Sequence, residues 1–221
     1  MVEFYSSDIC EKSFSELVAF ARKANELGES PLLFGGWAVY HYNPYAGSKD
    51  VDCVVSKERF DWLVDYLVGK GYGQRELRLF KDRVFFDLYK QDESIGEGAG
   101  RVELADLFSG SSEAYLRGYK GTKTTGVRVL IPSVPALLRS KICAMACREV
   151  AKDRSDVAAL LLELDVNDAQ SMAASLPEAL KKRVVSLRND TQTLGLVTKP
   201  TKVNLKKLNN KIRLVSTGRI R

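Results

Sequence analysis

Two aspartates, Asp50 and Asp52, are separated by one residue in the segment KDVDCVV. The alternation of polar and apolar residues there is typical of a β-strand. Because successive side chains of a strand point to opposite faces, we expect both carboxylates to lie on the same face. Adjacent carboxylates repel each other, and a divalent cation relieves that repulsion. Hard oxygen ligands favour Mg²⁺ or Mn²⁺, so the pair predicts a metal site.

Two consecutive glycines, Gly35 and Gly36, precede this strand in the chain. They follow a short apolar strand, expected over residues 32–34, and they open a helix expected over residues 37–42. Glycines at this point let a phosphate approach the backbone N–H groups of a helix N-terminus. The order of strand, diglycine, helix and Asp-x-Asp strand therefore predicts a site that places a nucleoside triphosphate against metal ions.

Each of these features is common by itself. A diglycine serves any tight turn from a strand into a helix, and an Asp-x-Asp strand is usually a solvated sheet face. Their combination in this order favours a nucleotide site over a simple turn and a solvated sheet face.

The diglycine followed by the Asp-x-Asp strand resembles the signature of the nucleotidyltransferase superfamily that includes DNA polymerase beta. In that superfamily a third acidic residue on a later strand completes the metal site. The best match is Asp87 in the segment RVFFDLY, where the alternate neighbours Phe85 and Tyr89 fit a strand. The resemblance implies that Asp50, Asp52 and Asp87 are catalytic metal ligands, with Mg²⁺ or Mn²⁺ as cofactor and a nucleoside triphosphate as substrate.

The turn before Asp50 departs from the superfamily pattern. Many relatives carry an arginine or a threonine-rich turn there, whereas this chain has Ser48 and Lys49. The resemblance implies that the Ser48 hydroxyl and the Lys49 ammonium group contact phosphate in place of that arginine or threonine. It also implies that Gly35 and Gly36 cradle phosphate.

Two subgroups of the superfamily are similar to different parts of the chain. The segment GGWAV is similar to aminoglycoside-type and small prokaryotic nucleotidyltransferases. The spacing of charged residues from Lys141 to Asp156 resembles a helical segment of the AbiEii-like toxins of abortive-infection and toxin–antitoxin systems. That resemblance implies that Lys141 contacts the triphosphate and that Asp156 faces the site. It also implies an RNA acceptor such as tRNA and an antitoxin as partners. Together the resemblances cover roughly residues 32–164.

The charge of the chain is concentrated at its end. Residues 1–180 hold 22 basic and 27 acidic residues, a net charge of −5, whereas residues 181–221 hold 12 basic residues and one acid, a net charge of +11. Such asymmetry suggests contact with a polyanion. The segment from residue 198 can form a basic amphipathic helix, which would either bind an RNA backbone or dock on the body with a solvated basic face. It has no aromatic residue on which bases could stack.

Other features of the composition are less distinctive. No apolar run approaches the ~18 residues of a membrane span, so we expect no membrane partner. The first residues lack a basic start and an apolar core, which favours a cytoplasmic protein. The four cysteines, Cys10, Cys53, Cys143 and Cys147, are expected to be buried free thiols, since the second pair of ligands for a zinc site is missing.

The pattern along the chain predicts an α/β (α+β) protein with a small mixed β-sheet and flanking helices. We expect a nucleotidyltransferase core over residues 1–132 and a helical C-terminal region with a basic tail over residues 133–221. A capping box at Ser13 predicts a helix from there to about residue 27. The pattern further predicts a helix over 57–69, a hairpin of strands 75–80 and 84–89 around Lys81 and Asp82, a long helix over 133–150, a helix that starts at Lys152, and two helices over 165–188.

The sequence therefore predicts an enzyme that transfers a nucleoside monophosphate from a nucleoside triphosphate to an acceptor hydroxyl, and the resemblance implies that Asp87 accepts the proton. The acceptor is RNA or tRNA in a toxin-like role, as the basic tail favours. Two alternatives stay open: a small-molecule transferase of the aminoglycoside type, and a catalytically silent module that binds RNA or a partner on the same fold.

Overall fold

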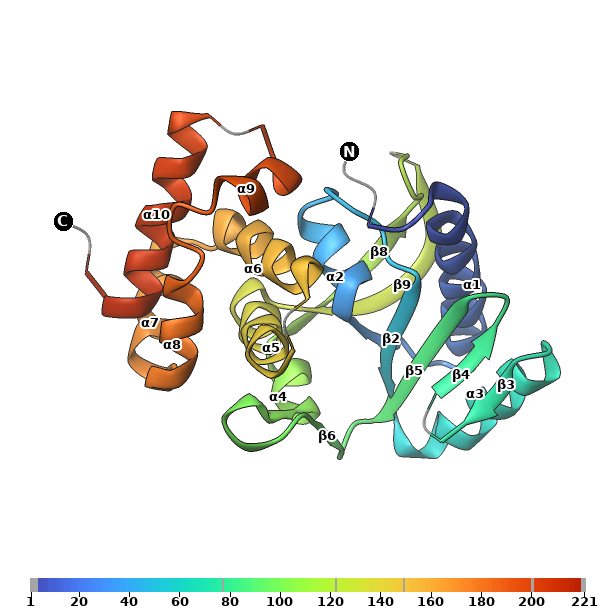
Figure 1. The fold of residues 1–221 in the computed structure, drawn as a ribbon. Coiled ribbons are helices and arrows are strands. Elements are labelled where there is room, and N and C mark those ends of the chain that lie inside the picture. Colours follow the sequence, from blue (N-terminus) through green and yellow to red (C-terminus); the bar gives the residue numbers. More distant parts are fainter. Residues whose placement is uncertain (1–3, 77, 122, 149, 200, 220–221) are drawn as a thin grey trace. The chain divides into compact units, whose positions relative to one another are not determined.

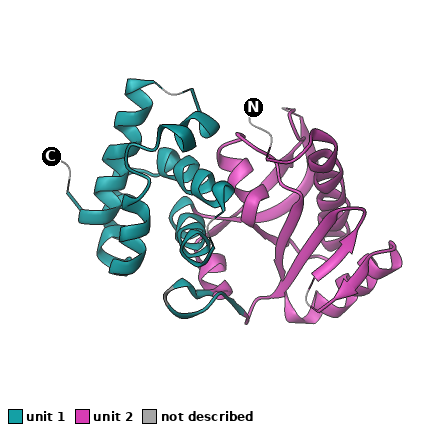
Figure 2. Ribbon diagram, in the orientation of Figure 1, with its two compact units in different colours: residues 1–2, 94–102, 134–221 teal, residues 3–93, 103–133 magenta. Residues whose placement is uncertain are grey.

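The computed structural model describes residues 4–76, 78–121, 123–148, 150–199 and 201–219. The chain divides into two compact units (Figure 2). Residues 3–93 and 103–133 form the first, here called the sheet unit. Residues 1–2, 94–102 and 134–221 form the second, here called the helical unit.

The sheet unit is built on a seven-stranded mixed sheet with the strand order β3-β4-β5-β2-β1-β9-β8 (Figure 1). In this sheet β2 runs parallel to β5 and antiparallel to β1, and β1 runs parallel to β9. The expected fold class is confirmed. The strands are β1 (Leu32–Phe34), β2 (Asp50–Val55), β3 (Gly73–Arg75), β4 (Arg78–Lys81), β5 (Val84–Lys90), β8 (Ser111–Arg117) and β9 (Thr124–Pro132).

Helices α1 (Ser7–Glu26) and α3 (Lys57–Gly69) cover one face of this sheet (Figure 1). The ring of Phe20 in α1 lies 5.2 Å from that of Phe86 in β5, and Tyr72, just after α3, approaches the same ring at 5.4 Å. Because side chains alternate along a strand, the neighbour of Phe86, Asp87, points to the opposite face. The two remaining helices of the unit are α2 (Gly35–Tyr42) and α4 (Leu104–Ser109).

Helix α1 begins earlier than the sequence predicts. Its first residue is Ser7, so Ser13 is not a helix cap but lies inside the helix and is fully buried. The Ser13 hydroxyl accepts a hydrogen bond of 3.0 Å from the indole Nε1 of Trp37 in α2. The capping box was therefore a wrong interpretation: this serine satisfies a buried indole donor in the core instead of a free backbone N–H group.

The hairpin of β4 and β5 is shifted by one residue from the predicted turn. Its two turn residues are Asp82 and Arg83, both with positive φ (47° and 72°), as a type I′ turn requires. Lys81 therefore pairs with Val84, and Arg78 pairs with Asp87. Moving a two-residue turn by one position changes every cross-strand partner by two residues, and here it decides that Arg78 faces Asp87.

The helical unit holds six α-helices among its described residues. They are α5 (Val134–Cys147), α6 (Ala151–Glu163), α7 (Val166–Ser175), α8 (Glu178–Val185), α9 (Thr191–Val197) and α10 (Lys202–Thr217). The segment that joins residues 90 and 104 contains β6 (Ser94–Ile95), a 3₁₀ turn over Gly98–Gly100 and β7 (Val102–Glu103), and β6 pairs with β7. The short helices α4 and α9 and the strand β8 had no counterpart in the sequence-based expectation.

Helix α6 forms the core of this unit, because ten of its thirteen residues are buried. Helix α10 packs beside it with Leu208, Ile212 and Val215 buried, which confirms a basic amphipathic helix in the tail. Cys147, the last residue of α5, is exposed, so the expectation of four buried thiols was wrong at this position, where the helix ends. None of the helices in the described part of the chain is both long and apolar enough to span a bilayer.

Candidate active site

Asp50 and Asp52 lie on one face of β2, as the alternation predicts. Both are half-buried, whereas the residues between and after them, Val51 and Cys53, are fully buried. Asp52 is the register partner of Asp87 on the parallel strand β5. Side chains in register on adjacent strands project from the same face of the sheet. The structure therefore brings the three predicted carboxylates to one face, opposite the helices α1 and α3.

Asp87 is held by an arginine that the sequence analysis did not single out. Arg78 donates to both of its oxygens, with Nε–Oδ1 at 2.7 Å and Nη2–Oδ2 at 2.6 Å. The hydrogen bond to Asp87 is the main reason why the pKa of Arg78 is raised; burial opposes it, and the charges of Asp87, Asp50 and Asp52 add to it. One guanidinium group thus interacts with all three acids.

Gly35 fixes the distance between helix α2 and Asp52. Its φ of +68° is in the left-handed region, and a Cβ built on it would overlap the carboxylate of Asp52. A side chain is excluded there for both reasons. Asp52 consequently lies at the first residue of α2, where the positive end of the helix dipole stabilises an anion. Gly36, the other predicted phosphate contact, lies buried in the first turn of the same helix.

Ser48 and Lys49 both serve local contacts at the start of β2. The buried Ser48 hydroxyl accepts a hydrogen bond of 3.3 Å from the backbone N–H of Asp50. The ammonium group of Lys49 lies 5.3 Å from the ring centroid of Phe85 and 5.5 Å from that of Tyr5. These three side chains, with Arg83, line a cavity of about 410 Å³. Phe85, which lines this cavity, is the register partner of Asp50 on β2.

The negative charge of the site also acts on two neighbours. Burial, and then the charges of Asp87 and Asp52, raise the pKa of the Tyr89 hydroxyl above its usual value. Burial, and then Asp52, raise the pKa of the Cys53 thiol well above its usual value. Both groups therefore stay protonated at neutral pH.

The donor set of the site fits a divalent cation in part. Mg²⁺ is commonly held by one or two carboxylates together with substrate phosphates and water, and Asp50 and Asp52 offer such a pair. Asp87 would join them only after Arg78 releases one of its oxygens. Among the described residues, no three Asp, Glu, His or Cys side chains already form a cluster that could hold a metal ion.

Lys141 and Asp156, the two predicted nucleotide contacts from the later segment, lie together in the helical unit. The Lys141 Nζ is 2.8 Å from Oδ2 of Asp156. Lys152, one turn before Asp156 on α6, places its Nζ at 3.1 Å from Oδ1 and 3.2 Å from Oδ2. All three residues are buried. The result is an interior cluster of two lysines and one aspartate.

Sequence reasoning missed two members of these clusters, and both had a signal. Arg78 would have been paired with Asp87 if the turn had been placed at residues 82–83. Lys152 stands four residues before Asp156, a spacing at which side chains meet on a helix.

Comparison with known proteins identifies a similar fold but no family or curated relative. No family model matches the chain, and no curated protein matches it. Among solved structures, the chain is similar to the crystal structure of an antigenic nucleotidyltransferase-like protein from Paracoccidioides brasiliensis. The TM-score is 0.55 at 15% sequence identity, and the match covers 91% of this chain and 94% of that chain. The protein therefore has a nucleotidyltransferase-like fold.

Proposed function

We propose that this protein is a metal-dependent nucleotidyltransferase that moves a nucleoside monophosphate from a nucleoside triphosphate to an acceptor hydroxyl. The observation that carries the proposal is the group of Asp50, Asp52 and Asp87 on one face of two adjacent strands. The nucleotidyltransferase-like fold supports it.

In this proposal Asp50 and Asp52 bind Mg²⁺ or Mn²⁺, which would neutralise phosphate charge and lower the pKa of the acceptor hydroxyl. Asp52 is held at the positive end of α2, and that arrangement orients its carboxylate for this role. Lys49 supplies a cation beside the carboxylates for the triphosphate, as a point charge on a flexible chain. Catalysis then depends mainly on positioning and charge stabilisation.

The acceptor is assigned by resemblance and not by the carboxylate site. An RNA acceptor, a toxin-like role with an antitoxin partner, and the triphosphate contacts of Lys141 and Asp156 stay predictions from resemblance. The aminoglycoside-type alternative rests on resemblance as well. Neither subgroup has support in the comparisons with known proteins.

A second candidate is a nucleotide- or partner-binding module that performs no transfer. One observation favours it: Arg78 engages both oxygens of Asp87, the third predicted metal ligand. In such a module the arginine would replace part of the positive charge that a metal ion brings to the site.

The experiment that tests the proposal is incubation of the full chain with each α-labelled nucleoside triphosphate, Mg²⁺ or Mn²⁺, and total cellular RNA or small alcohols. We expect labelled acceptor with the intact protein and a loss of at least about 10³-fold in Asp50→Asn/Asp52→Asn, since an electrostatic role at the reacting phosphate is removed. Asp65→Asn on the exposed side of α3 is the matched control and should retain full activity.

Manganese binding separates the two candidates when no transfer is found. Tight Mn²⁺ binding that requires Asp50 and Asp52, with no labelled acceptor under any condition, would support the binding module. Label transfer that survives in Asp50→Asn/Asp52→Asn would contradict the assignment of these residues.

A further inference from the structure

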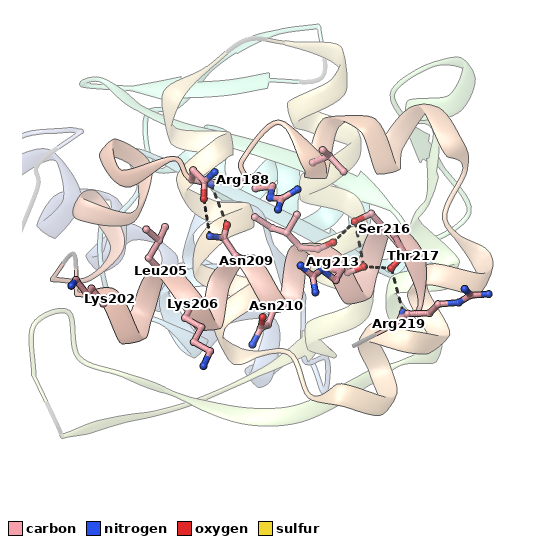
Figure 3. Close-up of a pocket in the computed structure, with 13 residues that line it drawn as sticks. Arg188, Lys202, Leu205, Lys206, Asn209, Asn210, Arg213, Ser216, Thr217 and Arg219 are labelled. Atoms are coloured by element: carbon pink, nitrogen blue, oxygen red, sulfur yellow. Dashed lines mark hydrogen bonds between the residues drawn. The ribbon is translucent and has the colours of Figure 1, made fainter. Parts of the chain in front are cut away.

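A groove along helix α10 gathers cations in the helical unit. Its volume is about 1040 Å³, and its charged lining residues are Arg188, Lys202, Lys206, Arg213 and Arg219. Figure 3 shows side chains of α10 in a row along this groove. We call it the α10 groove. Its charged side chains are all basic.

The row on α10 follows the helical repeat. Lys202, Lys206 and Arg213 are spaced by four and seven residues, and Asn209 and Asn210 lie between the last two. Residues with this spacing share one face of a helix. Leu208 and Val215 are buried on the opposite face. At ~1.5 Å per residue, Lys202 and Arg213 are about 16 Å apart along the axis, more than one phosphate group can span.

The positive charge of the groove is not compensated by acids. None of its five cations forms an ion pair within the described part of the chain. The one acid of residues 181–221 is Asp190. Its Oδ2 lies 2.6 Å from Nη2 of Arg154, and it also caps α9 by accepting from the backbone N–H of Thr193. Asp190 is therefore committed to contacts outside the groove.

One wall of the groove is fixed by a pair of asparagines. The amide of Asn209 on α10 donates to the side-chain oxygen of Asn189 at 3.0 Å, and the backbone N–H of Asn189 donates to the side-chain oxygen of Asn209 at 3.1 Å. These bonds tie the segment between α8 and α9, which carries Arg188, to α10. The cations of the two elements are therefore presented together.

We propose that the α10 groove binds the phosphate backbone of a nucleic acid strand. This inference goes beyond the proposed function, because it would hold even if the sheet unit performed no transfer. A row of unpaired cations longer than one phosphate matches a chain of phosphates, and interspersed amides and hydroxyls can donate to phosphate oxygens or sugars. Among the residues that the structure describes, the groove has no aromatic lining residue for base stacking, so we expect binding to be independent of sequence.

A strand fits the groove better than a membrane surface does. The apolar lining residues Val185, Leu205 and Ile212 are part of the concave wall, whereas an interfacial helix presents its apolar face outward to the lipid. The apolar face of α10 is instead buried in the helical unit. The ligand that fits the groove is therefore a nucleic acid strand.

The test measures binding of a fluorescein-labelled mixed-sequence RNA of about 20 nucleotides to the full chain by anisotropy, over a series of salt concentrations. We compare the wild type with Lys206→Gln/Arg213→Gln. For single strands each lost phosphate contact reduces the salt slope by about 0.7, so two lost contacts reduce it by about 1.4. The same term predicts a Kd about 25-fold higher at about 0.1 M salt.

The matched control removes two positive charges from the same elements outside the groove. Lys207 is exposed on α10 and Lys182 is exposed on α8, and neither lines the groove. We expect Lys182→Gln/Lys207→Gln to bind RNA within about threefold of the wild type, since exposed charges that do not line the groove make no phosphate contact in it and are partly screened at this salt concentration. An equal loss of RNA affinity in both double variants would overturn the proposal that the groove binds RNA. It would show that affinity depends only on the net charge of the protein.

Further binding measurements identify the ligand of the groove and test whether RNA binding depends on the active site. Equal binding of single-stranded DNA supports a backbone site, whereas binding of anionic phosphatidylserine vesicles in place of RNA would overturn the proposal. Asp50→Asn/Asp52→Asn should bind RNA as the wild type does even where transfer is lost. If that variant loses transfer but keeps RNA binding, the two sites act separately. The groove variant should show the opposite result, with RNA binding weakened and the active site intact. The two proposals can therefore fail independently of each other.

Discussion

Asp156 and Asp87 were both predicted site residues, and both form ion pairs, but the two pairs differ in their contact with water. The Asp156 side chain is 1% exposed and its partner Lys141 is 9% exposed. Asp87 is 13% exposed, and its partner Arg78 is 50% exposed. The cluster around Asp156 is therefore buried inside the helical unit, whereas Asp87 belongs to a partly exposed ion pair that can exchange its partner.

The physical consequence follows from desolvation. The two buried lysines share the carboxylate of Asp156, and loss of an opposite charge in the interior is costly. A half-exposed arginine that loses its partner can instead turn to water, so its ion pair contributes little to stability. Burial thus favours a structural contribution of Asp156 and leaves Asp87 available for exchange with a substrate or metal ion.

Replacement of Asp156 should have the largest effect. Asp156→Ala leaves Lys141 and Lys152 buried without their shared carboxylate, and we expect the free energy of unfolding to fall by about 3–5 kcal/mol. Urea denaturation of the full chain, followed by circular dichroism, measures this.

The control for that variant is on the same helix. Asp153 is also buried, but its partner Arg148 is 62% exposed and can be solvated after the loss. Asp153→Ala should therefore cost about 1 kcal/mol. Equal losses for Asp153 and Asp156 would contradict the distinction drawn from the exposure of their partners.

Replacement of Arg78 should change metal binding more than stability. In Arg78→Ala both oxygens of Asp87 are released, and a cation that interacts with Asp50 and Asp52 is removed. We expect Mn²⁺ to bind about tenfold more tightly, which corresponds to about 1.4 kcal/mol, and the free energy of unfolding to fall by at most about 1 kcal/mol. Calorimetric titration with Mn²⁺ in the absence of nucleotide tests this.

Arg75→Ala is the matched variant, since Arg75 is the register partner of Arg78 on β3 and is exposed. Its Mn²⁺ affinity should equal that of the wild type. An Arg78→Ala protein with unchanged or weaker Mn²⁺ binding would show that Asp87 does not join the metal site.

Local patterns in the sequence predicted the elements of the carboxylate site well. Helix α3 has the predicted bounds, and strand β2 presents Asp50 and Asp52 on the predicted face, because period-two alternation and the flanking turn are local signals. The parallel pairing of Asp52 with Asp87 required the fold-level resemblance, since nothing local specifies which strands become neighbours.

The errors arose where a single residue had two plausible environments. Ser13 matches a helix cap in spacing, but the indole of Trp37, far away in the chain, is its partner. The turn of the β4–β5 hairpin was placed one residue early, because its second residue is Arg83, and arginine is not among the residues that favour the positive φ of this position. That single step concealed the contact of Arg78 with Asp87.

Asp190 extends the comparison to a third ion pair and should give the smallest effect. Burial raises its pKa, but hydrogen bonds from Arg154 and Thr193 outweigh that effect and lower the pKa below its usual value. A carboxyl group with a lowered pKa in the folded state stabilises the protein above its unfolded pKa of about 3.9, and the stabilisation is lost as the pH falls through the folded value.

In Asp190→Asn the asparagine still caps α9 but cannot form the ion pair with Arg154. We expect a free energy of unfolding lower than that of the wild type by at most about 1 kcal/mol at neutral pH. This difference should shrink as the pH falls below about 4, because Asp190 then takes up a proton first in the unfolded state and, at lower pH, in the folded state as well. Urea denaturation of both proteins across this range measures it. A difference that stays constant with pH would mean that the ion pair contributes nothing, and that Asp190 acts on the helical unit only as a cap.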